Sequence, residues 1–297
     1  MQVASNNPPK PAWMKRPLPR SVGLRPMKNM LRELKLVTVC EEARCPNAPE
    51  CFSRGTSTFM ILGDVCTRKC GFCAVSKGRP LPPAPDEPGR VAEAVRLLKL
   101  RHAVITSVDR DDLKDGGATH WAATIAAVKQ AAPATTVEVL TPDFQGKEWQ
   151  IDLVIAAAPH VYNHNIETVP SQYLRVRPGA RYERSLSLLQ RVASKCKDTR
   201  AKSGIMLGLG ETRAEVLQVF RDLRDHGVEI LTVGQYLAPT AEGKLPITRF
   251  IPPEEFDNYR YEAMLMGFSS VAAGPYVRSS YHAEESFLLS ASNASGA

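Results

Sequence analysis

The sequence predicts an α/β protein built as a partial (β/α)6 barrel between residues 54 and 240. Short apolar runs rich in β-branched residues recur at intervals of roughly 25–40 residues. Segments with helical spacing of apolar residues lie between them. Strands that alternate with helices imply a parallel sheet. Six units are fewer than the eight of a closed barrel, so an open partial barrel and a doubly wound sheet both fit.

The elements follow in a regular order. The expected strands are 56–63, 102–108, 135–141, 160–166, 201–208 and 229–236, and the expected helices include 90–100, 180–195, 211–227 and 251–267. Six prolines before residue 28 predict an extended arm there, since proline breaks helices. We predict three parts: an N-terminal arm and cysteine segment (1–53), the barrel (54–240), and a C-terminal extension (241–297), with an ordered tail from about 271, that closes the barrel.

Polar residues gather where the predicted strands end. In parallel β/α folds the carboxyl ends of the strands carry the active site. Solvation of loops would also place polar residues there, so only their accumulation counts as evidence. They are Thr106, Ser107, Asp109, Thr141, Asp143, Asn163, His164, Asn165, Lys202, Ser203, Gln235 and Tyr236.

Composition excludes several classes of protein. The chain has no run of 18 apolar residues, which argues against a membrane-spanning helix. The net charge of +7 suits an acidic partner, but no nucleic-acid motif accompanies it. The basic, proline-rich start lacks the apolar core of a secretion signal. We therefore expect a cytoplasmic protein, with a monomer as the default state.

Six of the seven cysteines lie between residues 40 and 73. The odd number and the absence of a secretion signal argue against a disulfide framework and favour metal or redox chemistry. In "GDVCTRKCGFCAV", Cys66, Cys70 and Cys73 are spaced C-x3-C-x2-C, directly after the first expected strand. Three thiolates would hold three corners of a four-iron cluster and leave the fourth iron open. We call these three residues the first triplet.

A second triplet precedes the barrel. Cys40, Cys45 and Cys51 are spaced C-x4-C-x5-C. A structural zinc site would need a fourth cysteine or histidine, and no histidine occurs before His102. Two neighbouring iron–sulfur clusters account better for the pattern, and a non-catalytic zinc protein is the alternative.

The first triplet, with Phe72 before its last cysteine, resembles the radical S-adenosylmethionine (SAM) superfamily, in which SAM binds the open iron. Both triplets together resemble the lipoyl synthase family. The resemblance runs from about Lys10 to Ala283. Its further blocks are "TSVDRDDLKDGGATHWA", "EVLTPDFQG", "VYNHNIETVPSQY", "RPGARYERSLSLL", "KSGIMLGLGET", "TVGQYLAPT" and "GPYVRSSYHA".

The resemblance implies a partial barrel of the radical SAM type, two [4Fe–4S] clusters and SAM. It implies insertion of two sulfur atoms at C6 and C8 of an octanoyl-lysine, with the second cluster as the sulfur source. The implied partners are an octanoylated lipoyl carrier domain, of an E2 subunit or the glycine cleavage H protein, and a ferredoxin- or flavodoxin-type electron donor. Another dual-cluster radical SAM enzyme, with an electron-relay cluster, is the alternative.

The resemblance also implies roles for single residues. Ser280, in "RSSY", would be the fourth ligand of the second cluster, with the adjacent Ser279 as the alternative. Other residues would contact SAM at the first cluster. These are Phe72, Thr106, Asn163, Asn165, Glu167, Lys202 and Ser203.

Overall fold

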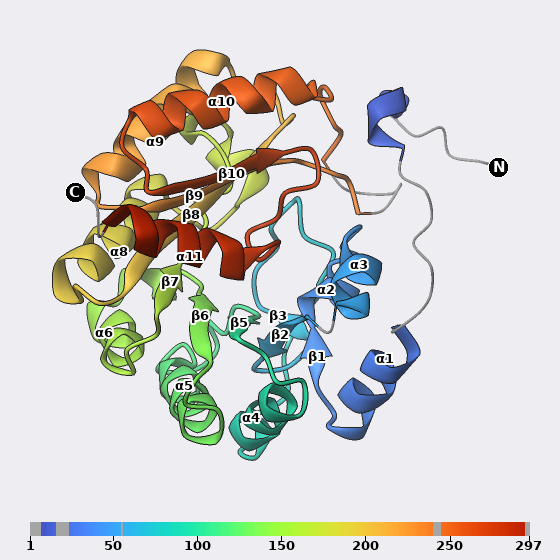
Figure 1. Cartoon of the computed structure of the whole chain (residues 1–297), viewed down its shortest axis with the longest axis vertical. Helices are drawn as coiled ribbons and strands as arrows, with labels where there is room; N and C mark the ends of the chain where they lie inside the picture. Colours follow the sequence, from blue (N-terminus) through green and yellow to red (C-terminus); the bar gives the residue numbers. More distant parts are fainter. Residues whose placement is uncertain (1–6, 16–23, 55, 240–244, 295–297) are drawn as a thin grey trace.

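The computed structural model describes residues 7–15, 24–54, 56–239 and 245–294. Its main feature is an eight-stranded sheet in the order β1-β2-β5-β6-β7-β8-β9-β10 (Figure 1). Strand β1 is antiparallel to β2, and the remaining neighbours are parallel. The strands are β1 Val37–Thr38, β2 Thr58–Ile61, β5 His102–Ser107, β6 Thr136–Leu140, β7 Val161–Asn163, β8 Arg200–Leu207, β9 Ile230–Gln235 and β10 Ser270–Gly274.

Six helices follow six of these strands and confirm the six predicted β/α units. They lie around the outside of the curved sheet (Figure 1). They are α4 Glu87–Leu97, α5 Ala118–Ala131, α6 Glu148–Ala156, α8 Tyr182–Lys195, α9 Arg213–Asp225 and α10 Pro253–Leu265. Strand β10 is a seventh parallel strand, where we predicted only an ordered tail. Its small residues gave little strand signal, and pairing with β9 decides its conformation.

The strand order agrees with a partial barrel. From β2 to β10 the strands follow chain order, without the central reversal of a doubly wound sheet. Within the described ranges no pairing joins the edge strands β1 and β10, so the sheet stays open. A core of fully buried side chains, including Ile105, Trp121 and Phe220, lies between sheet and helices.

The N-terminal part corrects one prediction. Helix α1 (Leu24–Glu33) begins inside the region predicted to be extended. Pro26 lies in its first turn. Proline is tolerated there because the N–H groups of the first turn have no acceptor within the helix. After β1, the short helices α2 (Val39–Glu42) and α3 (Ala48–Ser53) carry Cys40 and Cys51. The predicted boundary at 240 lies outside the described residues.

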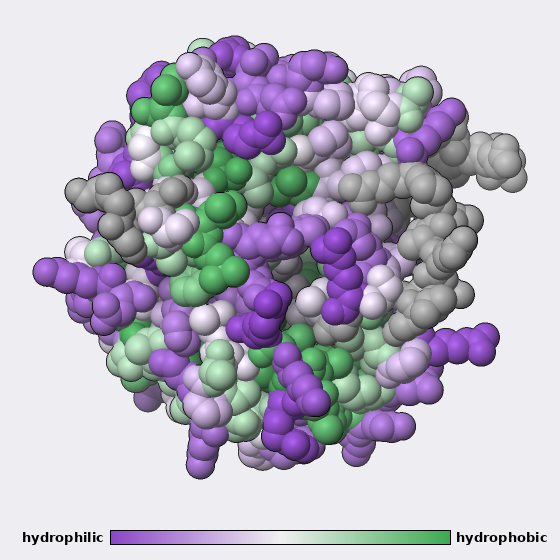
Figure 2. Space-filling model, in the orientation of Figure 1, coloured by the Kyte–Doolittle hydropathy of each residue, from purple (hydrophilic) through white to green (hydrophobic). Residues whose placement is uncertain are grey.

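Helix α11 (Ala283–Ala294) contacts β5, β9 and β10. Phe287 packs against His102 and His160, with ring centroids 5.8 and 6.3 Å apart, at the amino-terminal ends of β5 and β7. Leu288 and Leu289 of the same helix are exposed. Hydrophobic residues gather on the face of the molecule that Figure 2 shows. In the described part of the chain, no helix has the length and apolar character needed to cross a bilayer.

Candidate functional site

The first triplet lies on a loop that leaves β2 through a fixed turn. Leu62 and Gly63 both have positive φ angles, 67° and 96°. The Leu62 N–H donates to Glu87 Oε2 at 2.8 Å, and Arg110 Nη1 donates to the Leu62 carbonyl at 3.0 Å. Two buried charged groups therefore hold a backbone conformation that leucine rarely adopts. This turn directs the chain into β3 (Val65–Cys66).

The first cavity is the hollow lined by the first triplet and by residues at the carboxyl ends of β5, β6 and β7. Its position is the active-site end expected for parallel β/α folds. The Asp109 N–H donates to Cys66 Sγ at 3.3 Å, which joins the cysteine loop to the end of β5. Its lining includes Cys66, Cys70, Phe72, Cys73, Thr106, Asp109, Thr141, Asn165, Glu167 and Arg177.

Several buried polar atoms of the first cavity lack a partner. Among the described residues, Ser107 Oγ, Thr141 Oγ1, Asn165 Oδ1 and Arg177 Nε have no hydrogen-bond partner. Leaving a buried donor or acceptor unpaired costs about 1–3 kcal/mol. Since all four residues line the cavity, it suits a ligand with several polar groups. The amino-acid end and ribose of SAM fit this requirement.

Glu167 and Arg177 place opposite charges in the first cavity. Burial raises the pKa of Glu167, and the nearby Arg177 opposes that shift. Asn165 Nδ2 donates to Glu167 Oε1 at 3.1 Å. Glu167 also has a positive φ of 68°, a strained conformation of the kind that clusters at functional sites. A carboxylate and a guanidinium together suit a ligand that carries an ammonium and a carboxylate group.

The second cavity lies beside the start of β2 and contains the second triplet. Its lining includes Cys40, Cys45, Cys51, Thr58, Arg278, Ser280, Tyr281 and His282. Tyr281 OH donates to the carboxylate of Glu50 on α3, 3.0 and 3.1 Å from its two oxygens. Asn47 Nδ2 donates to the Tyr276 carbonyl at 2.7 Å. These contacts hold the C-terminal tail against the helix that carries Cys51.

The two serines of the tail point to different cavities. Ser280 lines the second cavity, and its Oγ accepts a hydrogen bond from Thr58 Oγ1 at 2.8 Å. Ser279 Oγ instead accepts from Asn165 Nδ2, a residue of the first cavity. The geometry therefore favours Ser280 over Ser279 as a ligand at the second triplet.

A four-iron cluster binds each thiolate at a different iron, so the three thiols of a triplet need not converge on one point. Within the described ranges no group of three or more His, Cys, Asp or Glu side chains is arranged to hold one metal ion. Burial raises the pKa of Cys40 to about 11 and of Cys70 to about 12, so these thiols need a positive group to become thiolates.

Three residues expected to contact SAM do not line the first cavity. Lys202 Nζ lies 2.8 Å from Glu138 Oε1, and both side chains are fully buried. Asn163 Nδ2 donates to the same carboxylate at 3.3 Å. Ser203 Oγ donates to the His164 carbonyl and accepts from a backbone N–H. Lys202 and Ser203 lie near the start of β8, away from its carboxyl end, and Asn163 ends β7 but turns its amide N–H toward the interior of the barrel.

The first cavity also contains residues that sequence reasoning missed. Arg68 and Arg177 line it, and Asp109 was noted only as one of many polar residues at strand ends. The position of Arg68 between Cys66 and Cys70 was the one available signal. Arg177 opens the block "RPGARYERSLSLL", but no role was assigned to it there.

The fold and the first cavity define a radical SAM protein. The model of the radical SAM superfamily matches residues 60–223. The hydrogenase maturase HydG of Carboxydothermus hydrogenoformans has a TM-score of 0.60 at 12% identity, covering 90% of this chain and 70% of that chain. Streptococcus suis SuiB bound to S-adenosylmethionine has a TM-score of 0.56 at 10% identity, covering 72% and 48%. These likenesses show the fold.

The sequence comparisons are more specific. The model of the N-terminal domain of lipoyl synthase matches residues 3–45. The lipoyl synthase of Methylococcus capsulatus is 56% identical over 277 residues, 93% of this chain and 86% of that protein. That of Thiobacillus denitrificans is 54% identical over 279 residues, 93% and 88%. The chain belongs to the lipoyl synthase family, whose members are radical SAM enzymes that use SAM and [4Fe–4S] clusters.

Proposed function

We propose that this chain inserts sulfur at C6 and C8 of an octanoyl-lysine on a carrier protein, with a cluster at the second triplet as the sulfur source. One observation carries the proposal: two separate cavities each hold three cysteines, and the C-terminal tail adds Ser280 to the lining of the second. An oxygen ligand is harder than a thiolate and binds iron less firmly. A cluster held this way is suited to being dismantled, and it acts as a substrate of the reaction.

The first cavity has a different task. When bound there, a cluster and SAM supply an organic radical that removes hydrogen atoms from unactivated C–H bonds, which no side-chain base removes near neutral pH. Cys66, Cys70 and Cys73 would hold the cluster. Glu167 and Arg177 would orient the charged end of SAM, and Phe72 would exclude water.

The partners belong to the same proposal. The substrate is a lipoyl carrier domain, from an E2 subunit or the glycine cleavage H protein, and the electron donor is of the ferredoxin or flavodoxin type. The exposed basic residues Arg54, Lys99 and Arg101 line the second cavity and would attract an acidic carrier. The seven cysteines are free, which suits the reducing cytoplasm. We retain the division into 1–53, 54–240 and 241–297, since the first part supplies the second triplet and the last part supplies Ser280 to the second cavity.

The test uses an octanoyl-lysine peptide, SAM, a reductant and protein whose second cluster carries labelled sulfide. We expect label in the product. Cys45→Ala should abolish sulfur insertion but retain SAM cleavage, because it removes a ligand of the second triplet only. Cys196→Ala is the matched control, since Cys196 lines neither cavity. Unchanged lipoyl formation by Cys45→Ala would rule out the donor role of the second cluster and overturn the proposal.

A further inference from the structure

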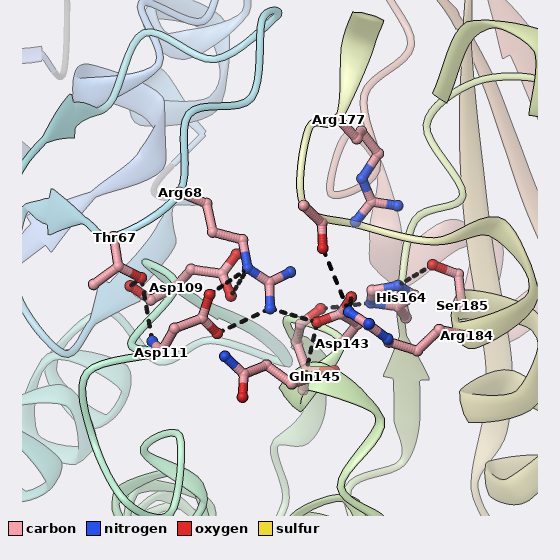
Figure 3. A network of polar contacts seen from close by, with 12 residues as sticks. Thr67, Arg68, Asp109, Asp111, Asp143, Gln145, His164, Arg177, Arg184 and Ser185 are labelled. Atoms are coloured by element: carbon pink, nitrogen blue, oxygen red, sulfur yellow. Dashed lines mark hydrogen bonds and ion pairs between the residues drawn. The ribbon is translucent and has the colours of Figure 1, made fainter. Parts of the chain in front are cut away.

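Arg68 lies in the first cysteine loop and is surrounded by carboxylates (Figure 3). Its side chain is only 7% exposed. Arg68 Nε and Nη2 donate to the two oxygens of Asp111 at 2.7 and 2.9 Å. Nη2 also donates to Asp143 Oδ1 at 2.6 Å, and Nε lies 3.2 Å from Asp109 Oδ1. Such bidentate, charge-assisted contacts fix direction as well as distance.

The three carboxylates come from two different loops of the barrel. Asp109 and Asp111 follow β5, whereas Asp143 follows β6. Asp143 is fully buried, and it is held in turn by Arg184 Nη1 of α8 at 3.1 Å. Figure 3 shows the guanidinium of Arg68 between these two groups of acids. The side chain therefore connects the cysteine loop to two neighbouring strands of the sheet at once.

Other hydrogen bonds between the loop and the barrel involve backbone groups, such as the Asp109 N–H that donates to Cys66 Sγ. Thr67 N–H and Oγ1 both donate to the Asp109 carbonyl, at 3.1 and 2.9 Å. Gly71 N–H donates to the Val176 carbonyl at 2.9 Å. Between β3 and β4 (Ser76–Lys77) the loop forms no helix or strand of its own. Its conformation therefore depends on contacts with the barrel, of which those of Arg68 are the most numerous and the most charged.

We propose that Arg68 is a positioning residue that holds the first cysteine loop against the ends of β5 and β6, so that its three thiols surround the first cavity before a cluster binds. A site ordered in advance loses less conformational freedom when it binds its cofactor. The effect of Arg68 on cluster binding rests on the proposed role of the first triplet as cluster ligands. The effect of Arg68 on the conformation of the loop does not depend on that role.

The first test measures hydrogen exchange in the cluster-free protein. Arg68→Gln should speed exchange of the amides of residues 66–73 at least tenfold. Arg68→Lys should have an intermediate effect, because lysine keeps the positive charge but cannot make the bidentate hydrogen bonds of the guanidinium. Lys69→Gln is the matched control, since it makes the same charge change at an exposed neighbour in the same loop. Slow exchange of the β6 and β8 amides verifies that the barrel is folded. Unchanged loop exchange in folded Arg68→Gln would overturn the proposal.

A double variant covers the case in which Arg68→Gln does not fold. Arg68→Gln/Asp143→Asn removes one buried charge of each sign, so fewer carboxylates are left uncompensated. We expect it to fold with loop exchange still tenfold faster than in the parent. Loop exchange as slow as in the parent would count against the role of Arg68.

The second test uses the cluster-loaded protein. Arg68→Gln should lose iron to a chelator several-fold faster than Lys69→Gln, and its midpoint potential should shift to more negative values because a nearby positive charge is gone. Equal iron loss and equal potentials in the two variants would overturn the effect on the cofactor. Cys70→Ala distinguishes the ligand role of the first triplet from the positioning role of Arg68. If Cys70→Ala binds as much iron as the parent, the proposed ligand role is wrong. Fast loop exchange in Arg68→Gln would still support the positioning role.

Discussion

Thr58 Oγ1 donates a hydrogen bond to Ser280 Oγ at 2.8 Å, although 222 residues separate the two in the chain. Thr58 begins the first strand of the barrel, and Ser280 lies in the C-terminal tail. The contact places the tail serine beside the second triplet, so the cavity is complete only when the two ends of the fold have come together.

The two tail serines should affect different parts of the reaction. Ser280→Ala should lower sulfur insertion at least tenfold and leave SAM cleavage intact, since it removes an oxygen from the second cavity only. Ser279→Ala should instead raise the KM for SAM a few-fold, because Ser279 Oγ holds Asn165. Product formation and 5′-deoxyadenosine formation, measured side by side, distinguish them. Equal effects of both variants on both products would contradict the assignment.

The buried pair Lys202–Glu138 should matter more for stability than for SAM binding. Burial opposes ionisation of Glu138, but Lys202 and a hydrogen bond with His102 lower its pKa to about 2. Lys202→Met should cost about 3–5 kcal/mol, because it removes the ammonium group that compensates a buried carboxylate. Glu138→Leu in the same chain should recover most of this loss. Urea unfolding of the cluster-free protein gives both values, and a large rise in the KM for SAM with unchanged stability would restore the expected SAM contact of Lys202.

His164 should make the protein sensitive to mild acid. Burial and the charge of Arg177, with a smaller contribution from Arg68, lower its pKa to about 4, against the opposing effects of the Thr141 carbonyl and Asp143. Its Nδ1 donates to that carbonyl at 2.8 Å, so Nε2 accepts from Ser185 Oγ at 3.0 Å. Below the ordinary histidine pKa of about 6.5, His164 binds a proton in the unfolded chain but stays neutral in the folded protein.

This contribution to stability is therefore present above about pH 6.5 and is lost as the pH falls toward 4. The full loss is roughly 3 kcal/mol, because one pKa unit corresponds to about 1.4 kcal/mol. Urea unfolding of the cluster-free protein at several pH values should show a shallower decline for His164→Gln, which does not titrate. Parallel declines for the parent and the variant would contradict the prediction.

Gly204 allows the close approach of Asn165 in the first cavity. A Cβ at this position would lie 2.4 Å from Thr232 Oγ1 and 2.9 Å from Asn165 Oδ1. Gly204→Ala should therefore displace Asn165 and raise the KM for SAM several-fold. Gly89→Ala is the control, because a Cβ there meets nothing within 4 Å, and in helix α4 it should stabilise the protein by about 0.5–1 kcal/mol. An unchanged KM in Gly204→Ala would show that the cavity adjusts freely.

The sequence alone determined the six β/α units and the two cysteine triplets. Both depend on local patterns. The spacing of apolar residues predicts strands such as β5 and helices such as α9, and the spacing C-x3-C-x2-C indicates which cysteines are ligands. The same local reasoning missed β10, whose small residues form a strand only because β9 offers an edge.

Only the tertiary structure decided which polar side chains face a cavity. The rule about strand ends selected both Lys202 and Asn165. The structure places Lys202 near the start of β8, where it pairs with a buried carboxylate, whereas Asn165 follows the end of β7 and lines the first cavity. Ser279 and Ser280 are adjacent in sequence and serve different cavities. Such choices depend on side-chain direction and on partners 64 to 222 residues away in the chain, which packing determines and no local pattern shows.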